Sequence, residues 1–405
     1  MWPLKVFCCL IIWPSIIHGN DLKNKLIDMA NENEPINNMF ELVPDGFLGQ
    51  GLFAVVFKGI RISDRRPVAL KFVPKEKSEE MEKSKEVKKK KEPMELEFNI
   101  CTYLKAINAS GVEQFGIPAV YYYGHFLDGS VIIMAITSLE QDLWTKDNER
   151  HFVENPINSL ILLKQFIVTT KYMHSLGVRH DDIKPENIMF RRDRSFLIDF
   201  NLSSKILEDE DGGTIEFCSR RIHKTMIRTP MCDWESFLYV LCQINRVNLK
   251  FLPHMNFDIT NQKIAFRSAG KMKFETNDTI TAIKLAVTDP HLRPVFIEFA
   301  EHVLLSDEFF PDYDGMYETV NEAIKKFPKD SKFYTWLTPA ENMAAKVELD
   351  NHPEPDVENA LIRAPNSIDF DNYRYPEPYP DIFGGFGLMR SISSKFALVV
   401  KSLMG

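Results

Sequence analysis

Apolar and polar residues alternate in the first part of the chain. The segments FLGQGLFAVVFKGIRI (47–62) and RPVALKFV (66–73) are rich in Val, Phe and Leu and have the short period of strands. VIIMAI (131–136) has the composition of a buried strand, and FLIDF (196–200) that of a short one. The pattern predicts strands at these four places.

Helical spacing follows the strands. It is visible in MELEFNICTYLKAI (94–107), and SLILLKQFIVTTKYMHSLG (159–177) predicts a long buried helix that ends at Gly177, a residue favoured at helix C-termini. DWESFLYVLCQI (233–244) predicts an apolar helix, and helical patterns continue to about residue 327. Strands that come first and helices that follow favour an α+β fold.

Other segments depart from these patterns. Residues 20–41 form a polar N-terminal extension. Between 75 and 92, 14 of 18 residues are charged, which predicts a solvated loop or helix extension, with nuclear import or partner binding as alternatives. The Pro- and Asp-rich tail, 328–405, has the composition of a segment without its own core. It ends in a basic amphipathic stretch that we expect to dock on the domain, a membrane being the alternative.

Composition narrows the class of protein. With 405 residues, 44% apolar and 26% charged, the chain is an ordinary globular protein. A net charge of −8 argues against a general nucleic-acid binder, and no apolar run is long enough for a transmembrane helix. Cys8 and Cys9 lie in the leader. The remaining four cysteines show neither metal-ligand spacing nor a disulfide framework; they are Cys101, Cys218, Cys232 and Cys242.

The first 19 residues resemble a targeting segment. Lys5 precedes an apolar run (6–17), and Gly19 is a small residue suited to cleavage. This predicts a signal peptide and entry into the secretory pathway. The alternative is a cytoplasmic protein whose start codon is misplaced or which carries a short membrane-associating tail.

A glycine-rich turn and a lysine are the first candidate chemistry. Gly49, Gly51 and Ala54 form a G-x-G-x-x-A arrangement between two strands, where the backbone can approach phosphates and point N–H groups at them. Lys71 follows on the next strand, placed to pair with nucleotide phosphates, and Glu97 is the helix carboxylate expected to hold it. Glu95 is the alternative partner.

The segment GVRHDDIKPENIMF (177–190) carries the second group of polar residues. Asp182, Lys184 and Asn187 stand in the order D-x-K-x-x-N, and Asp199 follows in LIDFNL. This order resembles the catalytic loop and metal-binding turn of protein kinases. The resemblance implies that Asp182 orients the substrate hydroxyl and that Lys184 neutralises charge on the phosphoryl group. Asn187 and Asp199 would then bind Mg²⁺.

A subfamily is also indicated. GTIEFCSRRIHKTMIRTPMCDWESFLYVL (213–241) resembles the casein kinase 1 superfamily, which includes the tau-tubulin and vaccinia-related kinases, and similarity extends from about 42 to 327. The matching positions are Gly213, Thr214, Phe217, Ser219, Asp233, Glu235, Ser236, Tyr239 and the late Pro311, Asp312 and Tyr313.

The resemblance implies a serine/threonine protein kinase that uses ATP and Mg²⁺. It also implies a bilobal fold, with a small, mainly β N-lobe and a larger α-helical C-lobe. Asp233 would anchor the catalytic loop from a helix. The hinge would lie at 134–137, with Met134 and Ile136 against the nucleotide, and Val56 would contact it from the strand after the glycine-rich turn. A protein substrate is expected, acidic or already phosphorylated if the basic residues of the segment 220–228 bind it.

Three departures from the commonest kinase pattern leave alternatives open. Asp181 stands where arginine is usual, Asn201 where glycine is usual, and Ala54 closes the glycine-rich turn. We expect Asp181 to pair with a base of the following segment and to order it; the alternative is that it faces solvent. Asn201 tolerates positive φ, so the turn is expected to survive. The competing function is a pseudokinase, a nucleotide-binding or scaffold module without transfer activity.

Overall fold

The computed structural model describes most of the region from Ser15 to Phe327. The described residues are 15–50, 54–74, 97, 100, 101, 104, 112–143, 151–192, 194–205, 213–225, 227–249, 273 and 276–327. The charged segment 75–92, the tail 328–405 and the leader up to residue 14 lie outside them, as does the alternative lysine partner Glu95.

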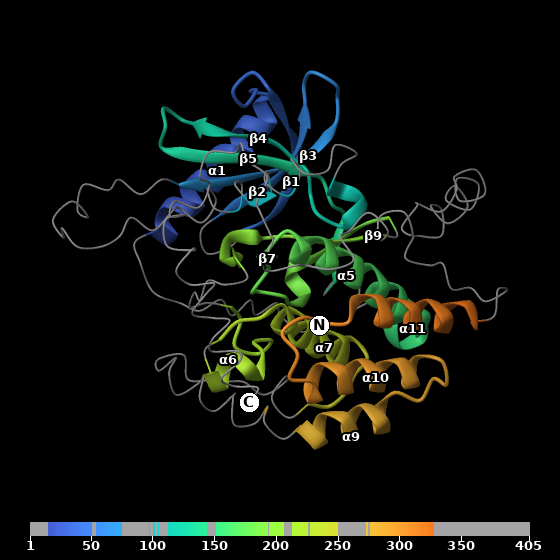
Figure 1. Cartoon of the computed structure of the whole chain (residues 1–405). Coiled ribbons are helices and arrows are strands. Elements are labelled where there is room, and N and C mark those ends of the chain that lie inside the picture. The colour runs from blue at the N-terminus through green and yellow to red at the C-terminus, as the bar shows by residue number, and fades with distance from the viewer. Residues whose placement is uncertain are drawn as a thin grey trace. The chain divides into compact units, whose positions relative to one another are not determined.

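A five-stranded antiparallel sheet forms the N-terminal part (Figure 1). Its strands in spatial order are β1 (Phe40–Gln50), β2 (Val55–Arg61), β3 (Pro67–Pro74), β5 (Val131–Thr137) and β4 (Val120–Phe126). The strands predicted around 47–62, 66–73 and 131–136 are confirmed.

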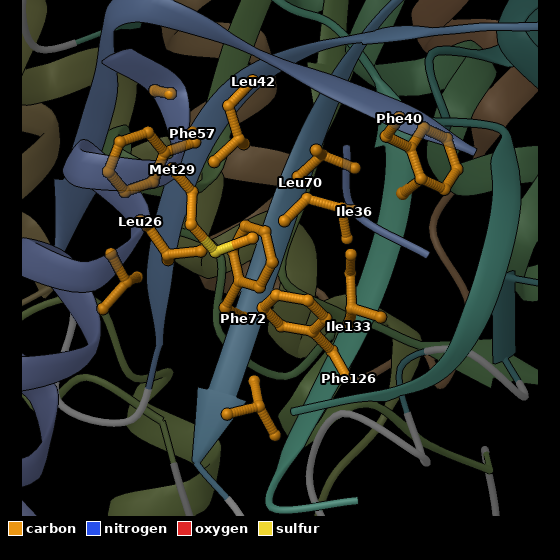
Figure 2. Close-up of a cluster of buried hydrophobic side chains, with 14 of the residues drawn as sticks. Leu26, Met29, Ile36, Phe40, Leu42, Phe57, Leu70, Phe72, Phe126 and Ile133 are labelled. Carbon is orange, nitrogen blue, oxygen red and sulfur yellow. The ribbon is translucent and has the colours of Figure 1, made fainter. Parts of the chain in front are cut away.

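One face of this sheet is buried under a helix that the sequence reading missed. Helix α1 (Ser15–Glu32) packs against β1, β2 and β3, and Figure 2 shows the apolar side chains between them. The helix contributes Leu22, Leu26, Met29 and Ala30, all buried. Their i, i+4, i+7, i+8 spacing is a helical stripe, so the signal was present within a segment that is polar on average. The helix also crosses the predicted leader boundary at residue 19.

The C-terminal part is mainly helical. Its helices are α4 (His151–Glu154), α5 (Ile157–Ser175), α6 (Arg220–Thr225), α7 (Pro230–Ile244), α9 (Thr276–Ala286), α10 (Leu292–Leu305) and α11 (Tyr313–Lys325). Short strands complete it: β6 (Gln141–Asp142), β8 (Ile188–Arg191) and β9 (Arg194–Leu197) pair in one sheet, and β7 (Val178–Arg179) pairs with β10 (Ser204–Lys205). The predicted α+β arrangement is confirmed.

Helix α5 is the centre of the helical part, since α7, α10 and α11 all pack against it. The rings of Phe166 on α5 and Phe237 on α7 stack at 3.7 Å, and Trp234 Nε1 donates to Thr170 Oγ1 at 3.0 Å. The helix ends at Ser175, and Gly177 takes a φ of 75°, as expected of a glycine after a helix C-terminus. The chain therefore leaves the core of the helical part directly into the segment that carries Asp182.

Short 3-10 turns separate these strands and helices: η2 (Val112–Phe115), η3 (Pro185–Asn187) and η4 (Phe200–Leu202). The strand predicted at 196–200 is β9, which begins at Arg194 and ends at Leu197, so that Asp199 lies in a turn. Within the described part of the chain, no helix combines the length and the apolar character that crossing a membrane requires.

Candidate active site

Four predicted nucleotide contacts lie in one row across the sheet. Gly49 pairs with Val56, Val56 with Lys71, and Lys71 with Met134. Directly opposed residues of antiparallel strands point to the same face, and this is the face opposite to the one covered by α1. Ile136 lies two residues after Met134 on β5, on the same face of the sheet and opposite Ala69.

Lys71 joins the two parts of the site. Its Nζ lies 2.6 Å from Glu97 Oε2 and 3.0 Å from Asp199 Oδ1. Burial disfavours the ammonium, but these two carboxylates outweigh it and raise the pKa of Lys71 above its ordinary value. Burial likewise opposes ionisation of Asp199, but Lys71 lowers the pKa of that carboxyl. Lys71 is therefore a cation held between two carboxylates, as predicted for its pairing with Glu97.

The turn around Asp199 differs from the expectation. The left-handed residue is Asp199 itself, with φ 66°, and Asn201 does not have positive φ. The expectation that Asn201 would serve as a glycine substitute in this conformation was therefore wrong. Asn201 lies in η4 instead, and its buried Oδ1 has no hydrogen-bond partner among the described residues.

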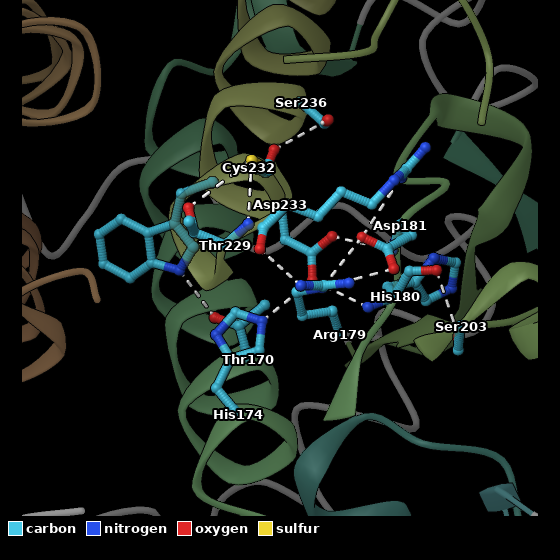
Figure 3. Close-up of polar contacts among 12 residues, drawn as sticks. Thr170, His174, Arg179, His180, Asp181, Ser203, Thr229, Cys232, Asp233 and Ser236 are labelled. Atoms are coloured by element: carbon cyan, nitrogen blue, oxygen red, sulfur yellow. Dashed lines mark hydrogen bonds and ion pairs between the residues drawn. The ribbon is translucent and has the colours of Figure 1, made fainter. Parts of the chain in front are cut away.

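Asp233 holds the catalytic loop, as the resemblance implied. Its two carboxylate oxygens each accept a backbone hydrogen bond of 2.9 Å, from His180 N and Asp181 N, and His174 Nε2 lies 2.9 Å from Oδ2 (Figure 3). Asp233 is in the first turn of α7, where the helix dipole favours a negative charge. Although burial opposes it, hydrogen bonding from His174 lowers the pKa of Asp233.

The side chain of Asp182 is buried at the centre of a polar cluster. Lys184 Nζ lies 2.7 Å from Oδ2, and Asn187 Nδ2 donates to Oδ2 at 3.1 Å. Thr214 donates twice to Oδ1, from its backbone N at 2.9 Å and from Oγ1 at 2.7 Å. Lys184 also donates to Thr214 Oγ1 at 3.1 Å. Thr214 was predicted only as a family match; its contact with Asp182 spans 32 positions, so no local pattern reveals it.

The donor set near Asp199 fits a magnesium ion. Asn187 lies next to this turn, because Ile198 N donates to Asn187 O at 3.0 Å. The Asn187 side chain donates from Nδ2 to the carbonyl and to the carboxylate of Asp182, and these bonds do not use its amide oxygen. Carboxylate and amide oxygens are the ligands that Mg²⁺ prefers. Asn187 and Asp199 could therefore hold the ion, with the orphaned oxygen of Asn201 nearby in sequence.

The predicted hinge, 134–137, is the end of β5, paired with β3 through Thr137. The connection to the helical part therefore begins after this residue. Thr137 N donates to Ala119 O at 3.0 Å, and Thr137 Oγ1 donates to Glu113 Oε1 at 2.5 Å. Glu113 also pairs with Arg191 of β8 through both oxygens, at 3.2 and 3.1 Å. A carboxylate that the sequence did not single out thus links the end of β5 to the strand that follows the catalytic loop.

Asp181 does not face solvent; that alternative was wrong. Its side chain is 3% exposed, and Oδ1 lies 3.3 Å from Arg179 Nε and 3.4 Å from Arg228 Nη1. Ser204 Oγ donates to Oδ2. The predicted pairing with a base of the following segment is thus present, and Arg228 is that base. Burial raises the pKa of Asp181, opposed by Arg179.

Other bases of the segment 220–228 are also used internally. Arg220 Nε lies 2.8 Å from Glu235 Oε1, and Nη2 donates to Leu304 O at 2.9 Å. Arg220 and Arg228 are both buried. Of the remaining predicted residues, Ala54 lies just before β2, the space that a Cβ would take at Gly49 is open, and Gly51 lies outside the described residues.

Comparison with known proteins agrees with this geometry. The family model of the protein kinase domain matches residues 43–305, so the chain belongs to the protein kinase family. Its curated relatives place it in the casein kinase 1-like group. It is 24% identical over 288 residues to "Casein kinase I homolog RAG8" of Kluyveromyces lactis, covering 66% of this chain and 48% of that protein.

Two further relatives are similar. "Casein kinase 1-like protein HD16" of Oryza sativa subsp. japonica is 26% identical over 245 residues, covering 54% of this chain and 32% of that protein. "Casein kinase I homolog 2" of Schizosaccharomyces pombe is 21% identical over 310 residues, covering 72% and 64%. The chain spans less than two thirds of the length of each of these relatives.

Proposed function

We propose that this chain is an active serine/threonine protein kinase that transfers the γ-phosphate of ATP to protein hydroxyls with the help of Mg²⁺. The observation that carries the proposal is the position of Lys71 between Glu97 and Asp199. In protein kinases the lysine–glutamate pair and the metal-binding aspartate must both be in place for transfer.

Each residue has a role in this proposal. Lys71 binds the nucleotide phosphates from the sheet, and Val56, Met134 and Ile136 line the same face. The Asp182 carboxylate accepts a hydrogen bond from the acceptor hydroxyl and so orients it. Lys184, whose pKa is raised by Asp182 against the effect of burial, stays cationic beside the transferred group. Asn187 and Asp199 would hold a magnesium ion, which would supply positive charge to the nucleotide phosphates.

Serine or threonine as acceptor is supported by Thr214. Its side chain and backbone both contact Asp182, and its hydroxyl contacts Lys184. These contacts hold the segment that follows Gly213 close against the catalytic aspartate, which favours a short acceptor side chain. The relatives are named casein kinase I homologs or casein kinase 1-like, which supports a protein substrate.

Transfer of labelled γ-phosphate to casein and to the protein itself tests the proposal, with wild type compared with Asp182→Asn. Incorporation that the variant abolishes would establish the activity. A folded wild-type protein that incorporates nothing would instead favour a pseudokinase. The departures of Asp181, Asn201 and Ala54 from the commonest kinase pattern support that alternative. Thermal stabilisation by Mg²⁺ and ATP, measured separately, reports whether nucleotide binds at all.

A further inference from the structure

The contacts of Asp181 join three segments of the chain. Arg179 and Asp181 flank His180 at the start of the catalytic loop, Ser204 lies on β10, and Arg228 lies just before α7. Arg179 Nη1 donates to the carbonyl of Arg228 at 2.6 Å, and Nη2 donates to Ser204 Oγ at 2.6 Å. The segment that begins with β10 and ends before α7 therefore contacts Arg179 and Asp181 at both of its ends.

The segment also approaches Asp181 through its backbone. Gly213 has a φ of 94°, and a Cβ at this position would lie 2.8 Å from the carbonyl oxygen of Asp181. The next residue is Thr214, which contacts Asp182. Packing at Asp181 is thus continuous with the contacts that define the position of the catalytic aspartate.

Charge explains why a carboxylate is needed between these residues. Two guanidinium groups, Arg179 and Arg228, lie in the interior with side chains 0% and 3% exposed. Buried cations are stable only when they are paired and hydrogen-bonded. Asp181 lies within ion-pair distance of both guanidinium groups and supplies an anion to each.

We propose that Asp181 is a positioning residue, a built-in counter-ion that holds the segment 213–229 against the catalytic loop without phosphorylation. Because the carboxylate occupies the position between Arg179 and Arg228, these arginines do not bind a phosphate of the segment or of a substrate. The inference rests on the proposed kinase function. It implies that substrate recognition does not depend on a phosphate or an acidic side chain bound at Arg179 and Arg228.

Hydrogen–deuterium exchange of the full chain tests the positioning role without relying on activity. In Asp181→Asn, which keeps the shape of the side chain, we expect the amides of 213–229 to exchange about tenfold faster or more. Amides of α5 and α10 should keep wild-type protection. Asp314→Asn is the matched control, because Asp314 pairs with the buried Lys171 on helices away from this segment. Wild-type exchange at 213–229 in Asp181→Asn would overturn the proposal.

Rescue by a small anion tests the counter-ion role. Asp181→Ala should lose protection at 213–229 and regain it with millimolar formate, whereas wild type should not respond. If Asp181→Ala fails to fold, Asp181→Arg combined with Arg228→Asp replaces it, and the double variant should be better protected than Asp181→Arg alone. Absence of recovery in the test that applies would overturn the counter-ion role.

Activity measurements then distinguish this inference from the proposed function. Treatment of wild type with a protein phosphatase should leave casein phosphorylation unchanged, and a phosphorylated peptide should not be preferred over its unphosphorylated form. Loss of activity after phosphatase treatment, or a phosphopeptide preference that Arg228→Gln abolishes, would overturn the inference while leaving the kinase function intact. An inactive wild type with normal exchange behaviour would instead overturn the kinase function alone.

Discussion

Lys273 donates a 2.6 Å hydrogen bond from its buried ammonium to the carbonyl oxygen of Cys218. A second bond of 2.6 Å goes to the carbonyl of Ile215, and the ammonium lies 5.1 Å from the ring centroid of Tyr239. Lys273 is 1% exposed. The lysine therefore ties the segment after Gly213 to the helical part from a position far along the chain.

We expect Lys273 to make the free energy of unfolding increase with pH in the alkaline range. Burial lowers its pKa to about 8 from an ordinary value of 10.5. Between about pH 8 and 10.5, Lys273 binds a proton in the unfolded chain but not in the folded chain. The contribution of Lys273 to the free energy of unfolding therefore rises with pH over this range. The wild-type free energy of unfolding should gain about 1 kcal/mol per pH unit over that of Lys273→Met.

Urea unfolding of the two proteins at pH 7.5, 8.5 and 9.5 measures this difference. Other groups titrate in both proteins and cancel in the comparison. A difference that does not change with pH would contradict the lowered pKa of Lys273.

Gly213→Ala should destabilise the protein more than Gly129→Ala. Both glycines have positive φ, 94° and 86°, but only Gly213 has a neighbour in the way, the carbonyl oxygen of Asp181 at 2.8 Å from the added Cβ. Gly129→Ala should cost about 1 kcal/mol, the price of the left-handed conformation, and Gly213→Ala about 2–3 kcal/mol. Urea unfolding measures both, and equal losses would argue against close packing of Gly213 on Asp181.

Thr214→Val should lower kcat by about 10- to 100-fold, because hydrogen bonds to charged groups contribute about 1.5–3 kcal/mol. The valine keeps the volume and loses the hydroxyl that bridges Asp182 and Lys184. Thr214→Ser keeps the hydroxyl and should retain most of the activity. Steady-state phosphorylation of casein measures kcat. A serine variant as impaired as the valine variant would show that the methyl group, not the hydroxyl, matters.

Glu97→Gln should raise the Mg²⁺ concentration needed for half-maximal activity by about tenfold. Without the Glu97 carboxylate, the carboxylate that remains beside Lys71 within the described part of the chain is Asp199. Lys71 then competes for the oxygen that would bind the metal. Glu41→Gln, which removes an exposed ion pair with Arg65, is the control and should leave the Mg²⁺ dependence unchanged. An unchanged Mg²⁺ requirement in Glu97→Gln would contradict this competition.

Short-range patterns were sufficient for much of the candidate site. Lys71 lies on an alternating strand, and Asp182, Lys184 and Asn187 are close neighbours in one loop, so their order in the sequence reflects the geometry that they adopt. Glu97 was also identifiable from a short-range pattern, because Ile100 and Leu104 follow it at helical spacing. Both of these side chains are fully buried in the structure. The strands and the long helix α5 were predicted from the spacing of the apolar residues.

By itself, the sequence determined the α+β fold and the kinase family, and it predicted the groups that we propose to handle phosphate. Only the tertiary structure decided three contacts. Arg228 is the base of the segment 220–228 that pairs with Asp181. Thr214 donates to Asp182, and Lys273 is buried against the carbonyls of Ile215 and Cys218. These contacts join residues 32 to 58 positions apart. Charge complementarity alone does not select among several bases; burial does, because an interior cation is stable only beside the carboxylate or carbonyl that folding places next to it.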